Sequence, residues 1–218
     1  MSWYLLVYIA GLYGWRAASH ILGDPDHFSP YFHDKYLAHL WLVRCHGVSG
    51  ALNLMLGPWL LSTRVRRSWP RLHRSLGRLY FAALIPAAGS GLILSSMAYG
   101  GRASQVALGL LCTGWIYTGW RAVLAIRQGR VTEHRHWMVR HYALTLAAVS
   151  LRVQTAWLAE APFPAIYARC AWLSWLPNLL LAELWIRRML SSKGAAAPPA
   201  RPGAGLAGGY PKPGGWLK

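Results

Sequence analysis

Long apolar stretches separated by short polar connections run along the chain. A bilayer hydrocarbon core about 30 Å thick requires roughly 20 apolar residues in a helix. Six stretches have this length, with approximate bounds 3–22, 37–61, 76–98, 103–126, 141–160 and 166–188. The pattern therefore predicts an all-α integral membrane bundle of six transmembrane helices.

Composition favours a membrane setting over a soluble one. Of the 218 residues, 55% are hydrophobic and only 13% are charged, which is fewer charges than a soluble domain of this length usually carries. The first apolar stretch is also long enough for a secretion signal, but no basic residue precedes it and Arg16 follows its apolar part. We therefore predict that it is a retained helix.

Arginine is concentrated in three segments that fall on one side of the predicted bundle. Cytoplasmic loops carry an excess of Lys and Arg, so this side, with both termini, is predicted to be cytoplasmic. Asp24, Asp26, Asp34 and Glu160 fall on the other side. The three segments contain Arg64, Arg66, Arg67, Arg71, Arg74 and Arg78; then Arg127, Arg130, Arg135 and Arg140; and finally Arg187 and Arg188.

The net charge of +17 would also suit a nucleic-acid-binding protein. Short basic loops beside transmembrane helices explain it better, because they set orientation and contact anionic lipid headgroups. The predicted partners are therefore a lipid bilayer with anionic headgroups and other membrane subunits, and no nucleic acid.

The chain divides into a transmembrane domain, residues 1–190, and a basic tail, residues 191–218. The tail is rich in Pro, Gly and Ala and is predicted to be disordered, with Tyr210 and Trp216 as candidate contacts to partner subunits. The transmembrane part has no phosphate loop, GxSxG or HExxH motif, and its three cysteines lack the spacing of a zinc site.

Charged residues inside the predicted spans call for partners. At ~1.5 Å per residue, Arg16, Arg44 and Arg152 lie roughly 9 to 12 Å inside the outer boundary, which suggests an anionic neighbour: a haem propionate, a quinone or lipid head, or outer carboxylates. The alternative is snorkelling to the headgroups. Glu183 precedes Arg187 by four residues, the spacing of a helix ion pair, with a proton-relay role as the alternative.

The nine histidines fall into an outer and a cytoplasmic group. Haem b needs two axial imidazoles at nearly the same depth, and His73 can pair in this way with His134 or His141, and less well with His136. The interfacial alternative is that these rings bond loop carbonyls or lipid phosphates. His46, near mid-membrane, has no histidine at its own depth, and Cys112 is the nearest soft ligand.

Three segments resemble the bacterial membrane-protein family called domain of unknown function 2306 (DUF2306): "HGVSGALNLMLGPWLL" at 46–61, "HRSLGRLY" at 73–80 and "HRHWMVRHYALTLAAVSLR" at 134–152. The resemblance spans roughly residues 36–155. It implies a multi-helix fold in the bacterial cytoplasmic (inner) membrane and no established activity. It assigns the family's polar signature to His46, His73, Arg74, Gly77, Arg78, Tyr80, His134, Trp137, Met138, Arg140, Tyr142 and Arg152. A fainter resemblance connects the chain to membrane b-type cytochromes.

The leading hypothesis is electron transfer linked to haem b or a quinone at a cytoplasmic pocket. Its predicted members are His73, Arg74, Arg78, His134, Arg140 and His141, with Glu133 almost the only acid nearby; His46, Arg44 and Arg152 are further candidates for cofactor contact. His73, His134 and His141 are the candidate ligands of a haem iron. The alternatives are a cofactor-free accessory subunit of a larger energy-converting complex and, less favoured, a small transporter, since no paired broken helices are evident.

Overall fold

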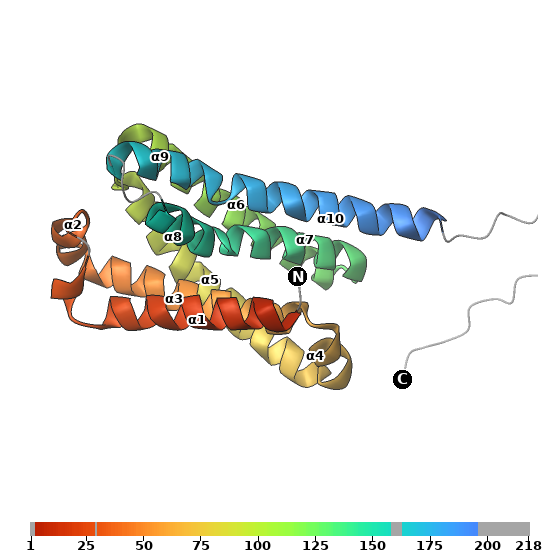
Figure 1. Cartoon of the computed structure of the whole chain (residues 1–218). Helices are drawn as coiled ribbons and strands as arrows, with labels where there is room; N and C mark the ends of the chain where they lie inside the picture. Colours follow the sequence, from red (N-terminus) through yellow and green to blue (C-terminus); the bar gives the residue numbers. More distant parts are fainter. Residues whose placement is uncertain (1–2, 29, 158–162, 196–218) are drawn as a thin grey trace, which may run out of the picture.

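The computed structural model describes residues 3–28, 30–157 and 163–195, and the described residues form helices joined by short turns, without a strand (Figure 1). The all-α prediction is confirmed. The elements are α1 (Trp3–Leu22), the 3₁₀ helix η1 (Pro25–His27), α2 (His33–Ala38), α3 (Leu40–Leu61), α4 (Thr63–Ser68), α5 (Pro70–Ser96), α6 (Gly101–Arg127), α7 (Val131–Thr145), α8 (Ala147–Trp157), α9 (Phe163–Leu173) and α10 (Leu176–Ala195).

The long helices run side by side in a bundle, and short connections bring alternate helix ends together. α3 packs on α1 and α5, α5 on α6, α6 on α7, and α10 on α7. One end of the bundle gathers α4, the α6–α7 turn and the end of α10, while α2 and α9 lie toward the opposite end (Figure 1). The end with α4, the α6–α7 turn and the end of α10 therefore contains all three arginine-rich segments, and we call it the arginine end.

The first four predicted spans each correspond to one long helix; the bounds of the first agree with α1, and those of the other three are shifted. α3 begins at Leu40 because a separate short helix, α2, ends at Ala38. α5 begins at Pro70, earlier than the predicted residue 76, because proline suits the first turn of a helix, where no N–H is needed. Among the described helices, α5 is the one with both the length and the apolar composition to cross a membrane.

The last two predicted spans differ from expectation because each is divided in two. α7 and α8 meet at Leu146, and α9 and α10 are separated by Ser174 and Trp175. Pro177 explains the second break: it lacks the N–H that would bond to the carbonyl of Leu173. Gln154 of α8 donates its side-chain N–H to that carbonyl instead, at 3.1 Å.

α10 continues to Ala195, so the first residues of the predicted tail are helical. Residues 196–218, with the expected anchors Tyr210 and Trp216, lie outside the described residues, as does the outer acidic residue Glu160.

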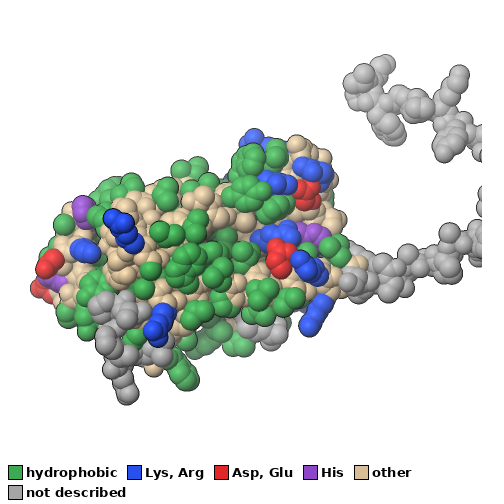
Figure 2. Space-filling model, turned by 90° about the horizontal axis from the view of Figure 1, so that it is seen from above, with side chains coloured by type: hydrophobic (Ala, Val, Ile, Leu, Met, Phe, Trp, Pro, Cys, Tyr) green, Lys and Arg blue, Asp and Glu red, His purple; other side chains and the backbone are tan. Residues whose placement is uncertain are grey.

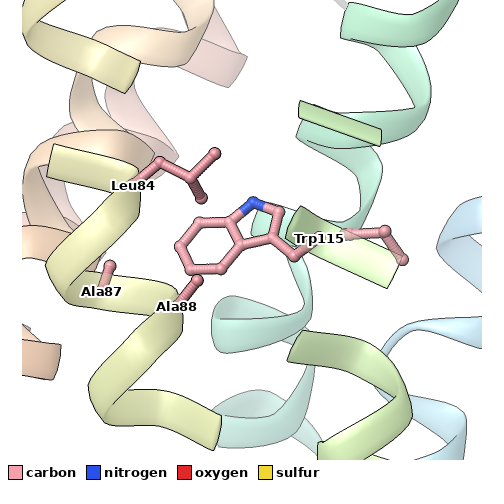
Figure 3. Packing of buried hydrophobic residues seen from close by; sticks show 5 residues of the cluster. Leu84, Ala87, Ala88 and Trp115 are labelled. Atoms are coloured by element: carbon pink, nitrogen blue, oxygen red, sulfur yellow. The ribbon is translucent and has the colours of Figure 1, made fainter. Parts of the chain in front are cut away.

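Small residues let the helices pack closely at the centre. The Trp115 indole of α6 lies against Leu84 and Ala88 of α5 (Figure 3), and Tyr80, fully buried, packs with Leu60, Ala122 and Met138 in a neighbouring cluster. These contacts fix the spacing of α5, α6 and α7.

The outside of the bundle is apolar along its length. Ile85 is 76% exposed and Trp157 is 86% exposed, which would be unfavourable in water on this scale. Figure 2 shows hydrophobic side chains across the middle of one face and charged side chains gathered toward its two ends. This distribution is what a lipid environment requires.

Candidate functional site

A large cavity of about 1030 Å³ opens at the arginine end, between α5, α6, α7 and α10 and beside the end of α3 and α4. Its inner part is apolar, with Leu60, Phe81, Met138 and Val139 among the lining residues. No Asp or Glu is among the described residues that line it. Its polar lining includes Arg66, Arg74, Arg78, Arg127, Arg135, His73, His134 and His136, and we call this cavity the His/Arg pocket.

One wall of the His/Arg pocket is the first half of α5. His73, Gly77 and Phe81 follow one another at intervals of four residues, which places them on one helix face, and all three line the pocket. Arg74 and Arg78 lie beside them and line it as well. Along this face of α5, the sequence "HRSLGRLYF" therefore presents an imidazole, then backbone without a side chain, then a phenyl ring.

The opposite wall is α7, where His134 is held in one tautomer. Its Nδ1 lies 2.8 Å from the carbonyl oxygen of Ala122 on α6, and since a carbonyl can only accept, Nδ1 carries the proton. The pKa of His134 is lowered, mainly by burial; the bond to Ala122 opposes this shift, and Arg135 and Arg66 add to it. The ring is therefore neutral at pH 7 and has a free lone pair on Nε2, as a metal-ligating histidine requires.

His73 of α5 lines the same pocket as His134, Arg66 and Arg74. Its Nδ1 is buried and, within the described part of the chain, has no hydrogen-bond partner. A buried polar atom of this kind usually has a partner. The pocket wall therefore contains two imidazoles, one of them fixed in its tautomer, while the Nδ1 atom of the other is buried in the protein.

The positive charge of the pocket is not neutralised by the nearby acid Glu133. This carboxylate accepts bonds from Arg121 at 3.2 Å, from Arg130 at 2.6 Å and from the Trp137 indole at 3.2 Å. The bond from Trp137 is the largest of the influences that lower the pKa of Glu133. The carboxylate thus fastens the α6–α7 turn, and the pocket arginines remain available to an anionic ligand.

Comparison with known proteins gives one match. A family model described as "Predicted membrane protein (DUF2306)" matches residues 43–186, more than half of the chain. The chain belongs to the DUF2306 family. No curated protein and no solved structure matches. The match continues to residue 186, beyond the 36–155 suggested by the motifs, and so includes α9 and part of α10.

The DUF2306 signature residues divide between the pocket and the packing around it. The pocket is lined by His73, Arg74, Gly77, Arg78, His134 and Met138. Tyr80 and Tyr142 are buried in the core, with their hydroxyl groups bonded to Thr145 at 3.3 Å and to the Leu54 carbonyl at 3.0 Å.

Two of the expected pocket members of this DUF2306 protein lie elsewhere. Arg140 is on another face of α7, where it forms an ion pair with Glu183 of α10 and lies over the Trp137 ring at 4.8 Å. Arg140 thus pairs with Glu183, the carboxylate for which Arg187 was the expected partner. His141 is fully buried, with Nδ1 3.0 Å from the Trp115 carbonyl and its ring stacked on that indole, so it does not line the pocket.

Two of the arginines expected inside the outer boundary contact main-chain carbonyls. Arg44 lies 3.4 Å from the Ile21 carbonyl, and Arg152 bonds the Ala148 carbonyl of its own helix at 2.9 Å. Both therefore have main-chain acceptors close by, and the anionic neighbour expected for them and for Arg16 stays a prediction.

His46 is a packed imidazole that donates Nδ1–H to the Ala87 carbonyl at 2.8 Å. Cys112, its expected neighbour by depth, lies close: a Cβ atom on Gly91 would meet His46 at 2.8 Å and the Cys112 sulfur at 3.1 Å. In the described residues no group of three or more His, Cys, Asp or Glu side chains is arranged to hold a metal ion.

Sequence reasoning did not place several residues in the pocket. Phe81 could have been found from its spacing of eight residues after His73, and Gly77, already part of the family signature, from its spacing of four. Trp185 and Met189 of α10 line the pocket too, but no sequence signal connects them to α5 because that contact depends on how α10 folds back.

Proposed function

We propose that this DUF2306 protein is a multi-pass protein of the bacterial cytoplasmic membrane, with the arginine end inside, and that it transfers electrons through haem b in the His/Arg pocket. One observation carries the proposal: imidazoles from α5 and α7 line a single apolar pocket whose arginines have no acidic partner within it.

The residues present fit such a group. A bis-imidazole haem needs two histidines near one another, and His73 and His134 line the same pocket. His134 offers Nε2 because Nδ1 is bonded to Ala122. Arginines such as Arg74 and Arg78 suit carboxylates, as in haem propionates. When bound, haem supplies reversible one-electron chemistry at its iron.

The chain's own residues set the environment of this site. Phe81, Met138 and Leu60 exclude water from the inner part of the pocket, and the cationic groups favour an anionic ligand at its mouth. The cavity of about 1030 Å³ is at the upper end of the roughly 300–1,000 Å³ typical of small-molecule sites. It is therefore large enough for a ligand of cofactor size.

A quinone in the same pocket is the second candidate. Trp185 and Met189 line the pocket although they are 51% and 37% exposed on α10, which places part of the pocket beside the lipid-facing surface. A lipid-soluble carrier could enter there and bond to a histidine.

The accessory-subunit hypothesis needs no cofactor and makes the opposite prediction in the test below. The two divided helix pairs, α7–α8 and α9–α10, remove one argument against the transporter, but the pocket's paired histidines favour redox chemistry.

The test is an absorption spectrum of the purified full-length protein, oxidised and then reduced with dithionite. We expect a Soret band and a sharp reduced α-band, and we expect His73→Ala and His134→Ala each to abolish the α-band. His33→Ala, at the opposite end of the bundle, is the matched control and should keep the wild-type spectrum.

Two other outcomes of this test would replace or overturn the proposed haem function. A colourless protein that binds a quinone analogue, with binding lost in His134→Ala, would replace haem by quinone. A colourless protein that binds neither and co-purifies stoichiometrically with other subunits would overturn the proposal in favour of an accessory role.

A further inference from the structure

Gly77 is placed where neither the backbone nor the protein packing calls for glycine. A glycine within a helix is less favourable than alanine because it loses more conformational freedom on folding. Within the described residues the glycines with positive φ are Gly100, Gly101 and Gly129, so Gly77 is in an ordinary helical conformation. A positive φ therefore does not explain this glycine.

Close packing is the usual demand, and it explains other glycines of the bundle. A Cβ atom on Gly57 would lie 1.9 Å from Tyr142, and one on Gly119 would lie 2.7 Å from Leu84. A Cβ atom on Gly77 would meet nothing within 4 Å. Because Gly77 lines the His/Arg pocket, the space in front of its backbone is the pocket itself.

The residues around Gly77 restrict which ligands can pack against this part of the α5 backbone. His73 is one turn before it and Phe81 one turn after it on the same face, and Arg74 and Arg78 lie alongside. A flexible acyl chain can bend around a side chain at position 77, whereas a wide, rigid ring system cannot. Glycine is the residue that permits a ligand to approach the main chain so closely.

We propose that Gly77 is a specificity-determining contact for a rigid, flat ring system that bears acid groups, of the porphyrin class. The ring system packs against the bare α5 backbone between His73 and Phe81, and its acid groups reach Arg74 and Arg78. This inference rests on the proposed function and deepens it by naming the ligand class and the surface that selects it.

The experiment compares two glycines of the same helix. Gly89 also has open space around its Cβ position, but it is exposed and is absent from the pocket lining. The full-length variants Gly77→Ala, Gly77→Leu, Gly89→Ala and Gly89→Leu are titrated with hemin and with metal-free protoporphyrin IX. Protoporphyrin lacks the iron, so its binding reports the ring contact without histidine ligation.

We expect Gly77→Leu to weaken both probes by at least about tenfold, which corresponds to about 1.4 kcal/mol, and Gly77→Ala to weaken them less. The Gly89 variants should bind as the wild type does. The Gly77 variants should melt at the wild-type temperature or above, since a side chain there meets no clash, and this shows that lost binding is not lost folding.

Failure of this inference differs from failure of the proposed function. If Gly77→Leu binds both probes as tightly as Gly89→Leu does, the Gly77 contact is wrong even where a haem spectrum is present. If the wild type binds protoporphyrin in a Gly77-dependent way but shows no bis-histidine haem spectrum, the contact stands and haem-linked electron transfer falls. If the wild type binds neither probe, both are overturned.

Discussion

Gly57→Ala is expected to lower the free energy of unfolding by at least about 3 kcal/mol, at the upper end of the range for overpacked cores. The added Cβ atom would lie 1.9 Å from Cε2 and 2.2 Å from Cδ2 of Tyr142. No Cβ atom tolerates such distances, so either the ring or the helix must move. This makes Gly57 the position where a single methyl group should disturb the bundle most.

The ring of Tyr142 cannot move without a second loss. Pro58 has no N–H, so the carbonyl of Leu54, four residues earlier, lacks its normal helical partner. The Tyr142 hydroxyl donates to that carbonyl at 3.0 Å and so joins α7 to α3. If the ring is displaced, a buried carbonyl is left unpaired, which costs about 1–3 kcal/mol.

Equilibrium unfolding of the purified protein in mixed detergent, followed by circular dichroism, measures this effect. Gly50→Ala on the same helix is the control, because a Cβ atom there would meet nothing within 4 Å, and it should be neutral or stabilising by up to about 1 kcal/mol. Tyr142→Ala with Gly57→Ala should cost less than the sum of the two single losses, because removing the ring also removes the clash. If Gly57→Ala unfolds as Gly50→Ala does, this account of the α3–α7 contact is wrong.

The location of the pocket could be predicted from the sequence because it depends on a few robust patterns. Apolar stretches of helical length define the bundle, and the placement of the arginines determines which ends share a side. Equal depth then pairs His73 with His134 or His141, and in the structure His73 and His134 line the same pocket. None of these steps required the contacts between particular side chains.

Arg140 and His141 were predicted to line the pocket but lie elsewhere, and their positions along α7 explain why. Arg140 follows His134 by six residues, so it points about 240° around α7 and meets α10. His141 follows by seven residues and returns to the face of His134, but it lies two turns deeper. There Phe81, Trp115 and Tyr80 surround its ring, and the cavity has already ended.

The side chains that bond to the carbonyls left free by proline could not be predicted, for a different reason. Pro58 and Pro177 show that helical hydrogen bonds are missing, but the residues that replace them, Tyr142 and Gln154, come from other helices. Which donor reaches which carbonyl depends on helix rotation, and a single sequence does not fix that rotation.

Glu183→Gln is expected to destabilise the bundle by about 2 kcal/mol. Both carboxylate oxygens of Glu183 accept bonds from Arg140, one of them at 2.9 Å from Nη2, in the two-pronged geometry that makes such pairs strong. Breaking a fully buried pair costs about 3–5 kcal/mol. The smaller value applies because the side chains are 22% and 33% exposed, and water can partly solvate the remaining charge.

A double-mutant cycle tests whether this loss belongs to the pair. Arg140→Gln should cost a similar amount, and Arg140→Gln with Glu183→Gln should cost clearly less than the sum, because no charge is then left unpaired. Arg140→Lys keeps the charge but not the planar fork over Trp137, so it should recover only part of the stability. Asp34→Asn, on the exposed α2, is the control and should unfold as the wild type does. Strictly additive losses in the cycle would mean that Arg140 and Glu183 stabilise α7 and α10 separately, and the interhelical pair would lose its assigned role.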